Sequence, residues 1–384
     1  MEKRRITHWI LISAIVVVVI LAITLGLVFG LRKDDNEEKN KNIHRDTTPS
    51  GTGGNEEEEE EDVEIINSYN NTDELIAEFP VTNNVTVLDG LERNIQNRLL
   101  TGFANWNKGF KAWKKWGDIL YTNASIYNVN GAHLTLAQYQ AAMDISLKRN
   151  KIELGQFHNM IINGNYTAIY YDDYHYDGEV KNPGTVMEFV RFKDYGPELG
   201  TRVVVGWGGT KGNAYDSMRT FQGDQQRMIQ NEQINLLLHY QIPTTGTLRE
   251  KYPILFPVEY LNKIIADKYI DIILEGFDKW NTDIDDYINW IGTRYTTNAS
   301  SKGLEDNERN MKTYKDDMKK LNEEYDIKKL YFDNILIRDD WAALHYRYRR
   351  VNRADNTTYV GDRMQFLKFV EEDGNYKIET SYIK

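Results

Sequence analysis

The chain has 384 residues, which is room for two ordinary globular domains and additional segments. Its 58 acidic residues exceed its 47 lysines and arginines, giving a formal net charge of −11 at pH 7, so we do not expect nucleic acid as a partner. With no cysteine and seven scattered histidines, the sequence gives no support to a metal site, a nucleophile triad or a cofactor.

The first apolar segment predicts a transmembrane helix. Residues 9–31 are almost wholly apolar and follow a short tail, residues 1–8. At about 1.5 Å per residue they are long enough to cross a hydrocarbon core of about 30 Å. A cleaved signal peptide is the alternative, because Lys3, Arg4 and Arg5 precede the segment, but its apolar region should span only about 7–15 residues. We therefore expect a single-pass membrane protein.

The glycosylation sequons predict on which side of the membrane the folded body lies. Basic residues flank the apolar segment on both sides, so charge counting does not decide the orientation. Asn-x-Ser/Thr sequons favour an extracellular or luminal body, whereas the absence of cysteine fits either side. The expected glycosylation sites are Asn70, Asn84, Asn123, Asn165, Asn298 and Asn356.

Residues 32–88 are predicted to form an acidic, disordered stalk. Up to residue 64 they hold hardly any apolar side chain, and Glu56–Glu61 is a run of glutamates. Such a composition cannot bury a core and repels itself into an extended spacer. The alternative is that the run collects cations or a basic partner.

Residues 89–212 predict the first folded domain. Leu91–Trp116 carries aromatic residues at helical spacing and Thr135–Arg149 predicts another helix. Between them we expect a turn at Tyr121–Asn123 and then a short strand or extended segment. Alternating strands follow at Phe157–Ile162, Tyr166–Tyr176, Thr185–Phe192 and Arg202–Trp207.

Residues 213–256 predict a connector that is partly helical, over Asp216–Tyr240. The glycine-rich stretch before it, Gly206–Gly212, superficially resembles a phosphate loop but lacks the G-x-x-x-x-G-K-[ST] spacing. It is better explained as a flexible exit from the last strand of the first domain.

Residues 257–384 predict a second domain with the same order of elements. Its helices are Val258–Ile291 and Asn307–Glu324, and its strands are Ile327–Ile337, Trp341–Arg350, Thr358–Val370 and Tyr376–Ile383. Helices followed by a meander indicate an α+β fold, with helices packed on one face of a curved antiparallel sheet.

The two domains also match in sequence. Residues 157–175 align without a gap to residues 332–350, and Trp106-Asn107 returns as Trp280-Asn281. A repeat of about 130–140 residues has the size of a domain, not of a solenoid unit. We interpret it as a tandem duplication.

These residues resemble the SnoaL-like branch of the nuclear transport factor 2-like superfamily. The resemblance rests on the order of elements and on Tyr121–Tyr127, Met187–Phe192, Arg202–Trp207, Trp341–Arg350, Gly361–Phe369 and Lys377–Tyr382. It implies two tandem cone-shaped domains, each with a curved sheet wrapped around an apolar pocket. The superfamily includes cyclases, dehydratases, isomerases, transport factors and domains of no known activity, so fold alone does not give function.

The positions that isomerase relatives use for catalysis are altered in both domains. The resemblance places Asn128 and Gly303 where the aspartate base stands, and neither can accept a proton. The enolate-side acid corresponds to Glu188 in the first domain and to Gln365 in the second. We therefore do not expect ketosteroid-isomerase chemistry.

Other acid–base chemistry stays open in the first domain. A glutamate with a pKa raised by an apolar cup, beside a histidine, would form a general acid/base pair, so the catalytic candidates are Glu188, His158 and Asp172. Strand alternation puts Tyr170 and Asp172 on one face and Tyr171, Asp173 and His175 on the other. The alternative is that Glu188 forms a salt bridge on the open side of the sheet.

The second domain offers an anion site. Trp341, His345, Arg347 and Arg349 share one strand face, which could present guanidinium groups to a carboxylate. The alternative, slightly favoured, is a convex face on which the arginines pair with Asp333, Asp339 or Asp362. The predicted ligand contacts are Tyr170, Trp106, Trp341, His345, Arg347 and Gln365.

The functional hypothesis is a membrane-anchored binding or interaction module for a small hydrophobic ligand. Two alternatives remain: a cyclase, hydratase or isomerase that uses Glu188 and His158, and a structural pseudo-dimer in which the two sheets pair. The first is distinguished by whether Glu188 and His158 face the same cavity. The second is distinguished by whether the convex sheet faces bury each other.

Overall fold

The computed structural model describes residues 64–66, 72–129, 132–149, 151–196, 200–209, 235–303 and 307–384. The expected membrane anchor, the glutamate run and Asn70 lie outside these residues. Among the described helices, none is both long and apolar enough to span a membrane.

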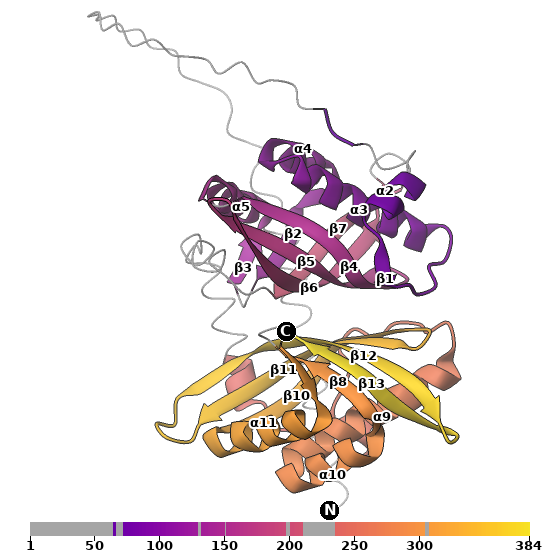
Figure 1. Ribbon diagram of the computed structural model, residues 1–384, viewed down its shortest axis with the longest axis vertical. Coiled ribbons are helices and arrows are strands. Elements are labelled where there is room, and N and C mark those ends of the chain that lie inside the picture. Colours follow the sequence, from indigo (N-terminus) through magenta and orange to yellow (C-terminus); the bar gives the residue numbers. More distant parts are fainter. Residues whose placement is uncertain are drawn as a thin grey trace, which may run out of the picture. The chain divides into compact units, whose positions relative to one another are not determined.

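The first half, residues 72–209, is built on a seven-stranded sheet with the order β1-β4-β5-β6-β7-β2-β3. Four strands from β4 to β7 form an antiparallel meander, while β1 joins β4 and β2 joins β7 in parallel. The strands are β1 (Val81–Asn83), β2 (Tyr121–Val129), β3 (Ala132–Thr135), β4 (Ile152–Asn163), β5 (Tyr166–Asp177), β6 (Val180–Asp194) and β7 (Thr201–Gly209). Figure 1 shows the helices of this half on one side of the sheet.

The helices of the first half depart from the sequence prediction at two places. They are α2 (Thr72–Glu78), α3 (Leu91–Asn107), α4 (Phe110–Leu120) and α5 (Leu136–Arg149). The single helix expected over Leu91–Trp116 breaks at Gly109, whose φ of 109° lies in the region that favours glycine. The predicted stalk also ends earlier, because Leu75 and Phe79 of α2 are buried in the core.

The second half, residues 248–384, repeats this architecture around a six-stranded sheet with the order β10-β11-β12-β13-β8-β9. Its strands are β8 (Tyr295–Lys302), β9 (Glu308–Asn310), β10 (Tyr325–Arg338), β11 (Trp341–Asn352), β12 (Thr358–Glu372) and β13 (Asn375–Ile383). Its helices are α8 (Leu248–Lys251), α9 (Lys263–Thr282), α10 (Ile284–Arg294) and α11 (Met311–Glu324). The predicted α+β class, with two sheets, is confirmed.

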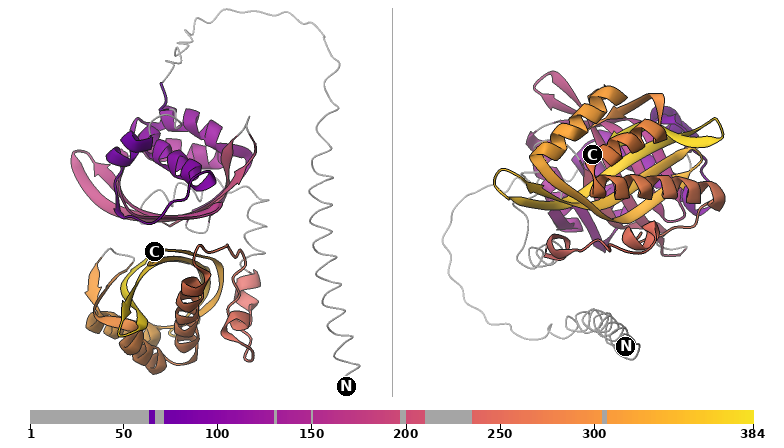
Figure 2. Two further views of the ribbon diagram at one scale, coloured as in Figure 1. Left: turned by 90° about the vertical axis from the view of Figure 1, so that its right-hand side faces the viewer. Right: turned by 90° about the horizontal axis from the view of Figure 1, so that it is seen from below.

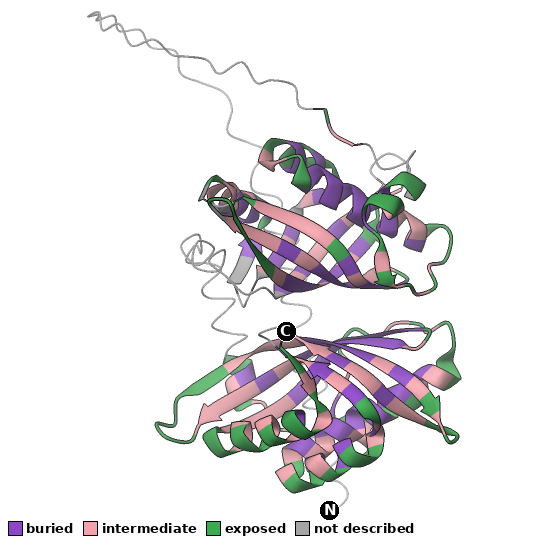
Figure 3. Cartoon of the chain, viewed as in Figure 1, coloured by how far each residue is buried: buried purple, intermediate pink, exposed green. Residues whose placement is uncertain are grey.

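Each half has its own core between helices and sheet. Figure 2 shows both sheets strongly curved, with helices on the concave side, and Figure 3 shows buried residues concentrated on the strands and on the helix faces turned toward them. Aromatic pairs dominate both cores: Phe103 contacts Phe157 and Tyr171, and Phe277 contacts Phe332 and Tyr346. Matched rings therefore join the long helix to the sheet in both halves.

A further cluster combines residues of both sheets. It contains Ile161, Ala168, Tyr170, Met187, Phe189, Leu336, Trp341, Ala343, Met364 and Phe366. Beside it, the guanidinium of Arg338 donates to Glu92 Oε1 and to the carbonyl of Ile162, both at 2.6 Å. Arg338 and Glu92 are both buried, so removing either partner would leave a charge without compensation.

Candidate functional site

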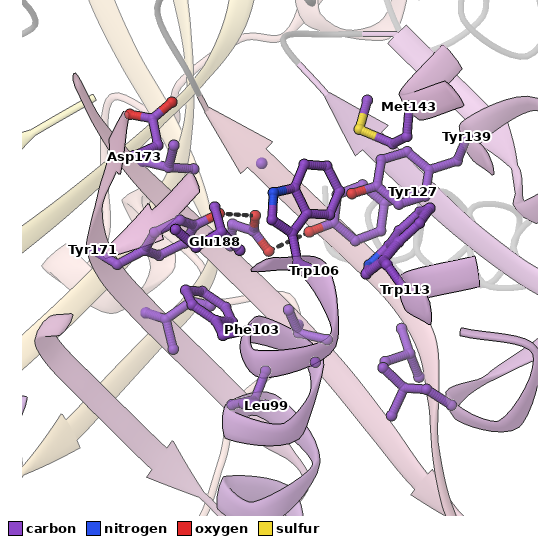
Figure 4. A pocket seen from close by; sticks show the side chains of 18 of the residues that line it. Leu99, Phe103, Trp106, Trp113, Tyr127, Tyr139, Met143, Tyr171, Asp173 and Glu188 are labelled. Carbon is purple, nitrogen blue, oxygen red and sulfur yellow. Dashed lines mark hydrogen bonds between the residues drawn. The ribbon is translucent and has the colours of Figure 1, made fainter. Parts of the chain in front are cut away.

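The first half encloses an apolar cavity between its sheet and its helices. The cavity has a volume of about 140 Å³ and is lined mainly by aromatic and aliphatic side chains. Figure 4 shows Glu188 at its centre, near Phe103 and Trp106 of α3 and between Tyr127 and Tyr171. A carboxyl group in this setting is the chemically distinctive feature of the cavity.

Two tyrosine hydroxyls hold the Glu188 carboxyl. Tyr127 donates to Oε2, and Tyr171 donates to Oε1 at 2.6 Å. Burial raises the pKa of Glu188 above its usual value, and the two hydroxyls oppose that rise without cancelling it. Burial and the neighbouring Glu188 also raise the pKa of both tyrosines, so they remain donors.

Three strands bring these groups together. Glu188 lies on β6, Tyr171 on β5 and Tyr127 on β2, which reaches β6 through β7. Tyr127 pairs with Gly206 of β7, where an added Cβ would lie 2.2 Å from the tyrosine ring. The glycine-rich stretch that resembled a phosphate loop is therefore strand as far as Gly209, and Gly206 makes room for Tyr127.

A second polar pair lines the same cavity. His175 Nε2 lies 2.5 Å from Asp173 Oδ2, and this bond raises the pKa of His175 although burial opposes it. Asp173 is buried, whereas a quarter of the His175 side chain is exposed. Both lie on β5 on the same face as Tyr171, as strand alternation predicts.

His158 and Asp172 are not brought together with Glu188. They form their own pair, with His158 Nε2 2.6 Å from Asp172 Oδ1, and neither lines the cavity. The His158 ring packs on Tyr170, which contacts Phe366 and Tyr382 of the second half. His158, Tyr170 and Asp172 thus lie on the opposite sheet face, because alternate residues of a strand point to opposite sides. Of the three catalytic candidates, only Glu188 faces the pocket.

The ligand contacts predicted in the second half are dispersed. Trp341 is buried in the cluster shared by both sheets, and the His345 ring lies 5.3 Å from the rings of Phe189 and Trp207. Arg347 Nε lies 2.5 Å from Asp333, one of the carboxylates expected for it under the structural alternative.

Trp106 and Gln365 each line a cavity. Trp106 lines the Glu188 cavity and donates from Nε1 to the carbonyl of Ile152 at 3.0 Å. Gln365 lines a different cavity, in the second half, where it donates to Ser381 Oγ at 2.8 Å.

Sequence reasoning missed the two tyrosines that bind Glu188. Tyr127 adjoins Asn128, the residue that the family resemblance singled out, and Tyr171 is the strand neighbour of Tyr170. The alternation of β5 already assigned Tyr171 to the other face from Tyr170, but no local signal says which face is concave. The position of Tyr127 depends on the pairing of β2 with β7, in which Tyr127 lies opposite Gly206, far along the sequence.

The remaining site predictions concern metals and glycans. No group of three potential metal ligands occurs within the described ranges. Of the predicted glycosylation sites, Asn84, Asn298 and Asn356 are exposed and Asn165 is half-buried.

No protein-family model matches the chain, and no curated protein matches it. Among solved structures, AclR, a proposed hydroxylase from Streptomyces galilaeus, is 18% identical over 31% of this chain and 74% of its own, with a TM-score of 0.26. A proposed SnoaL-like polyketide cyclase from Jannaschia sp. CCS1 is 13% identical over 31% of this chain and 85% of its own, with a TM-score of 0.26. An NTF2-like protein of unknown function from Pseudomonas putida KT2440 is 11% identical over 33% of this chain and 89% of its own, again with a TM-score of 0.26.

Proposed function

We propose that the first half binds a small apolar molecule that carries one hydrogen-bond acceptor, and that Glu188 is its polar anchor. The observation that carries this proposal is the Glu188 carboxyl, held by Tyr127 and Tyr171 inside an apolar cavity. Both carboxyl oxygens accept bonds from tyrosines, so the proton of a neutral Glu188 is free to be donated to a ligand. A carbonyl or an aromatic nitrogen would accept it.

The size of the cavity limits the ligand. Its volume of about 140 Å³ is close to the roughly 150 Å³ of an engineered apolar cavity that binds benzene. It lies below the roughly 300–1,000 Å³ of pockets for drug-sized ligands. The proposed ligand therefore has about the size of one six-membered ring.

Acid–base catalysis is the second candidate function, and the Asp173–His175 pair favours it. A cavity that holds a carboxyl with a raised pKa and a histidine–aspartate pair has an acid and a base available to one substrate. In this second candidate function, the histidine of the acid–base pair is His175 and not the His158 predicted from the sequence.

The wider architecture is also part of the proposal. We place the two folded halves outside the membrane as tandem SnoaL-like domains, on an acidic stalk anchored by residues 9–31. The matched aromatic contacts of the two cores support the duplication. The apolar cluster shared by both sheets supports a pseudo-dimer in which the halves pair with each other.

The binding proposal is tested by titrating the full chain with pyridine and with benzene, two ligands of nearly equal shape. The measurement is tryptophan fluorescence, since Trp106, Trp113 and Trp116 line the cavity. One hydrogen bond is worth about 0.5–1.5 kcal/mol, so pyridine should bind about 2–13 times more tightly than benzene. Equal affinity for the two ligands, or binding of neither, would reject the proposal.

Substitutions at Glu188 test whether its carboxyl causes the preference for pyridine over benzene. In Glu188→Gln the amide still donates but does not titrate, so the preference should persist without pH dependence. In the wild type it should fall as pH rises through the raised pKa of Glu188, because a carboxylate cannot donate. Glu179→Gln, in the exposed turn between β5 and β6, is the matched control and should behave as the wild type.

A further inference from the structure

The second half contains a lysine in an aromatic environment. Lys329 lies on β10, and Asn281 clamps its backbone: the Lys329 N–H donates to Asn281 Oδ1 at 2.9 Å, and Asn281 Nδ2 donates to the Lys329 carbonyl at 2.7 Å. In the first half, Asn107 clamps Leu154 through the same two bonds, each 2.8 Å. Lys329 thus occupies the position of a leucine that lines the first cavity.

Aromatic rings surround the amine of Lys329. Its Nζ lies 4.6 Å from the ring centroid of Phe277, 5.1 Å from Trp280, 5.2 Å from Tyr287 and 6.0 Å from Tyr346. Within the described part of the chain it has no hydrogen bond or ion pair with a side chain or carbonyl. Burial without a counter-charge lowers the pKa of Lys329 to about 7.

The amine faces a cavity large enough for a ligand. Lys329 lines a cavity of about 650 Å³, together with Trp280, Tyr287, Tyr346 and Gln365. This volume is within the range of roughly 300–1,000 Å³ that is usual for small-molecule pockets. It is separate from the Glu188 cavity, with which it shares no residue.

Two arginines, Arg350 and Arg363, also line this cavity, together with the carboxylates Asp317 and Glu324. The Arg363 guanidinium stacks on Tyr348 at 4.8 Å, and that of Arg350 on Tyr359 at 5.3 Å. Neither forms an ion pair with a carboxylate in the part of the chain that the structure describes. Stacked guanidinium groups keep their N–H donors available for a carboxylate or a phosphate.

We propose that Lys329 forms an imine with a carbonyl compound that also carries an anionic group, which Arg350 and Arg363 bind. The amine nitrogen attacks the carbonyl carbon, and the carbonyl oxygen leaves as water with the two amine protons, so that a C=N bond replaces C=O. An unprotonated amine surrounded by aromatic rings is the form of lysine that reacts in this way, and about half of Lys329 is in this form at pH 7.

The test uses the full chain, 4-formylbenzoate as the probe and cyanoborohydride to reduce any imine to a stable amine. Peptide mapping then measures the labelling rate of each lysine at pH 7. We expect Lys329 to be labelled on the order of 10-fold or more faster than Lys328, its half-buried neighbour, because the lowered pKa of Lys329 leaves about half of its amine unprotonated at pH 7. Benzaldehyde, which lacks the carboxylate, should label Lys329 more slowly than 4-formylbenzoate.

Two results would overturn the inference. One is labelling of Lys329 no faster than Lys328. The other is 4-formylbenzoate binding in the cavity without forming an adduct, which would make Lys329 a non-covalent anchor. The rate comparison between lysines is made within the wild-type chain, so it needs no variant to fold. Arg363→Met separately tests binding of the carboxylate, because it should remove the faster labelling by 4-formylbenzoate than by benzaldehyde. Because the Glu188 cavity is not involved, failure of one proposal leaves the other standing.

Discussion

The two halves share a scaffold but differ in the chemistry of their cavities. Asn107 and Asn281 form the same clamp, and Trp106 and Trp280 donate to the equivalent strand carbonyls at 3.0 and 2.9 Å. On this common frame, the first cavity holds an acid, Glu188, and the second holds an amine, Lys329. The two halves therefore share the hydrogen bonds that position their strands, although the titratable side chain in each cavity is different.

Polar groups are satisfied differently in the two cavities. The Glu188 carboxyl has two tyrosine donors, whereas the amine of Lys329 contacts only aromatic ring faces among the residues that the structure describes. Burial shifts each pKa toward the neutral form, upward for the acid and downward for the amine. Both cavities therefore favour uncharged groups, although the residues are of opposite type.

The largest expected effect is that of removing the acid. Glu188→Leu leaves the buried hydroxyls of Tyr127 and Tyr171 without their acceptor, at about 1–3 kcal/mol each, so the free energy of unfolding should fall by about 2–6 kcal/mol. Gln365→Leu is the matched change in the second half, where the side chain donates only to Ser381. Urea denaturation should show the smaller loss for Gln365→Leu, and equal losses would contradict the tyrosine account.

Replacing Lys329 should have the opposite effect and raise the free energy of unfolding. Lys329→Leu places in the second cavity the residue type of the first, and should stabilise the chain by about 1–4 kcal/mol at pH 6, where a half-buried ammonium without a counter-charge is costly. The pKa of about 7 lies below the ordinary value of 10.5, so between these pH values the unfolded state binds more protons and the wild type gains stability as pH rises. The advantage of the variant should therefore shrink from pH 7 toward pH 10.

The control for this prediction is Lys328→Leu, which should change stability by less than about 1 kcal/mol at either pH, since that side chain is one-third exposed. If Lys329→Leu is less stable than the wild type at pH 6, the attraction between the ammonium and the four rings exceeds the cost of burial.

Removing the asparagine clamp should lower the stability by a similar amount in both halves. Asn107→Ala removes two hydrogen bonds to the backbone of Leu154, and Asn281→Ala removes the matching pair at Lys329. Each should lower the free energy of unfolding by about 1–3 kcal/mol. Asn281 also donates to Tyr252 at 3.2 Å, so its loss should be equal or slightly larger. A large effect in one half alone would show that the clamps are not equivalent.

The smallest expected effect is a change in pH dependence. The pKa of Glu188 is raised above 4.5, so the folded state binds more protons from pH 4.5 up to the raised value, and stability falls as pH increases through that window. The slope for one group is at most about 1.4 kcal/mol per pH unit. Glu188→Gln should remove this fall in urea melts at pH 4–8, whereas Glu179→Gln should keep it.

Periodicity by itself determined the order of the four meander strands and of the longer helices that precede them in both halves. The strands at Tyr166–Tyr176 and Trp341–Arg350, and the α+β class, follow from local alternation and helical spacing, which short-range sterics and burial impose. Alternation also separated Tyr170 from Tyr171 correctly. The breaks at Gly109 and Asp283 were missed because a continuous aromatic stripe hides an interruption of one or two residues.

Only the tertiary structure decided which strand face lines a cavity. The curvature of each sheet and the position of its helices make Tyr171 and Glu188 internal, and place His158, Asp172 and Trp341 on the other side. Tyr127 joined Glu188 through a parallel pairing distant in sequence, and Lys329 became an isolated amine through rings from three elements. A local pattern sets which residues share a face, but burial and pKa depend on contacts between segments far apart in the chain.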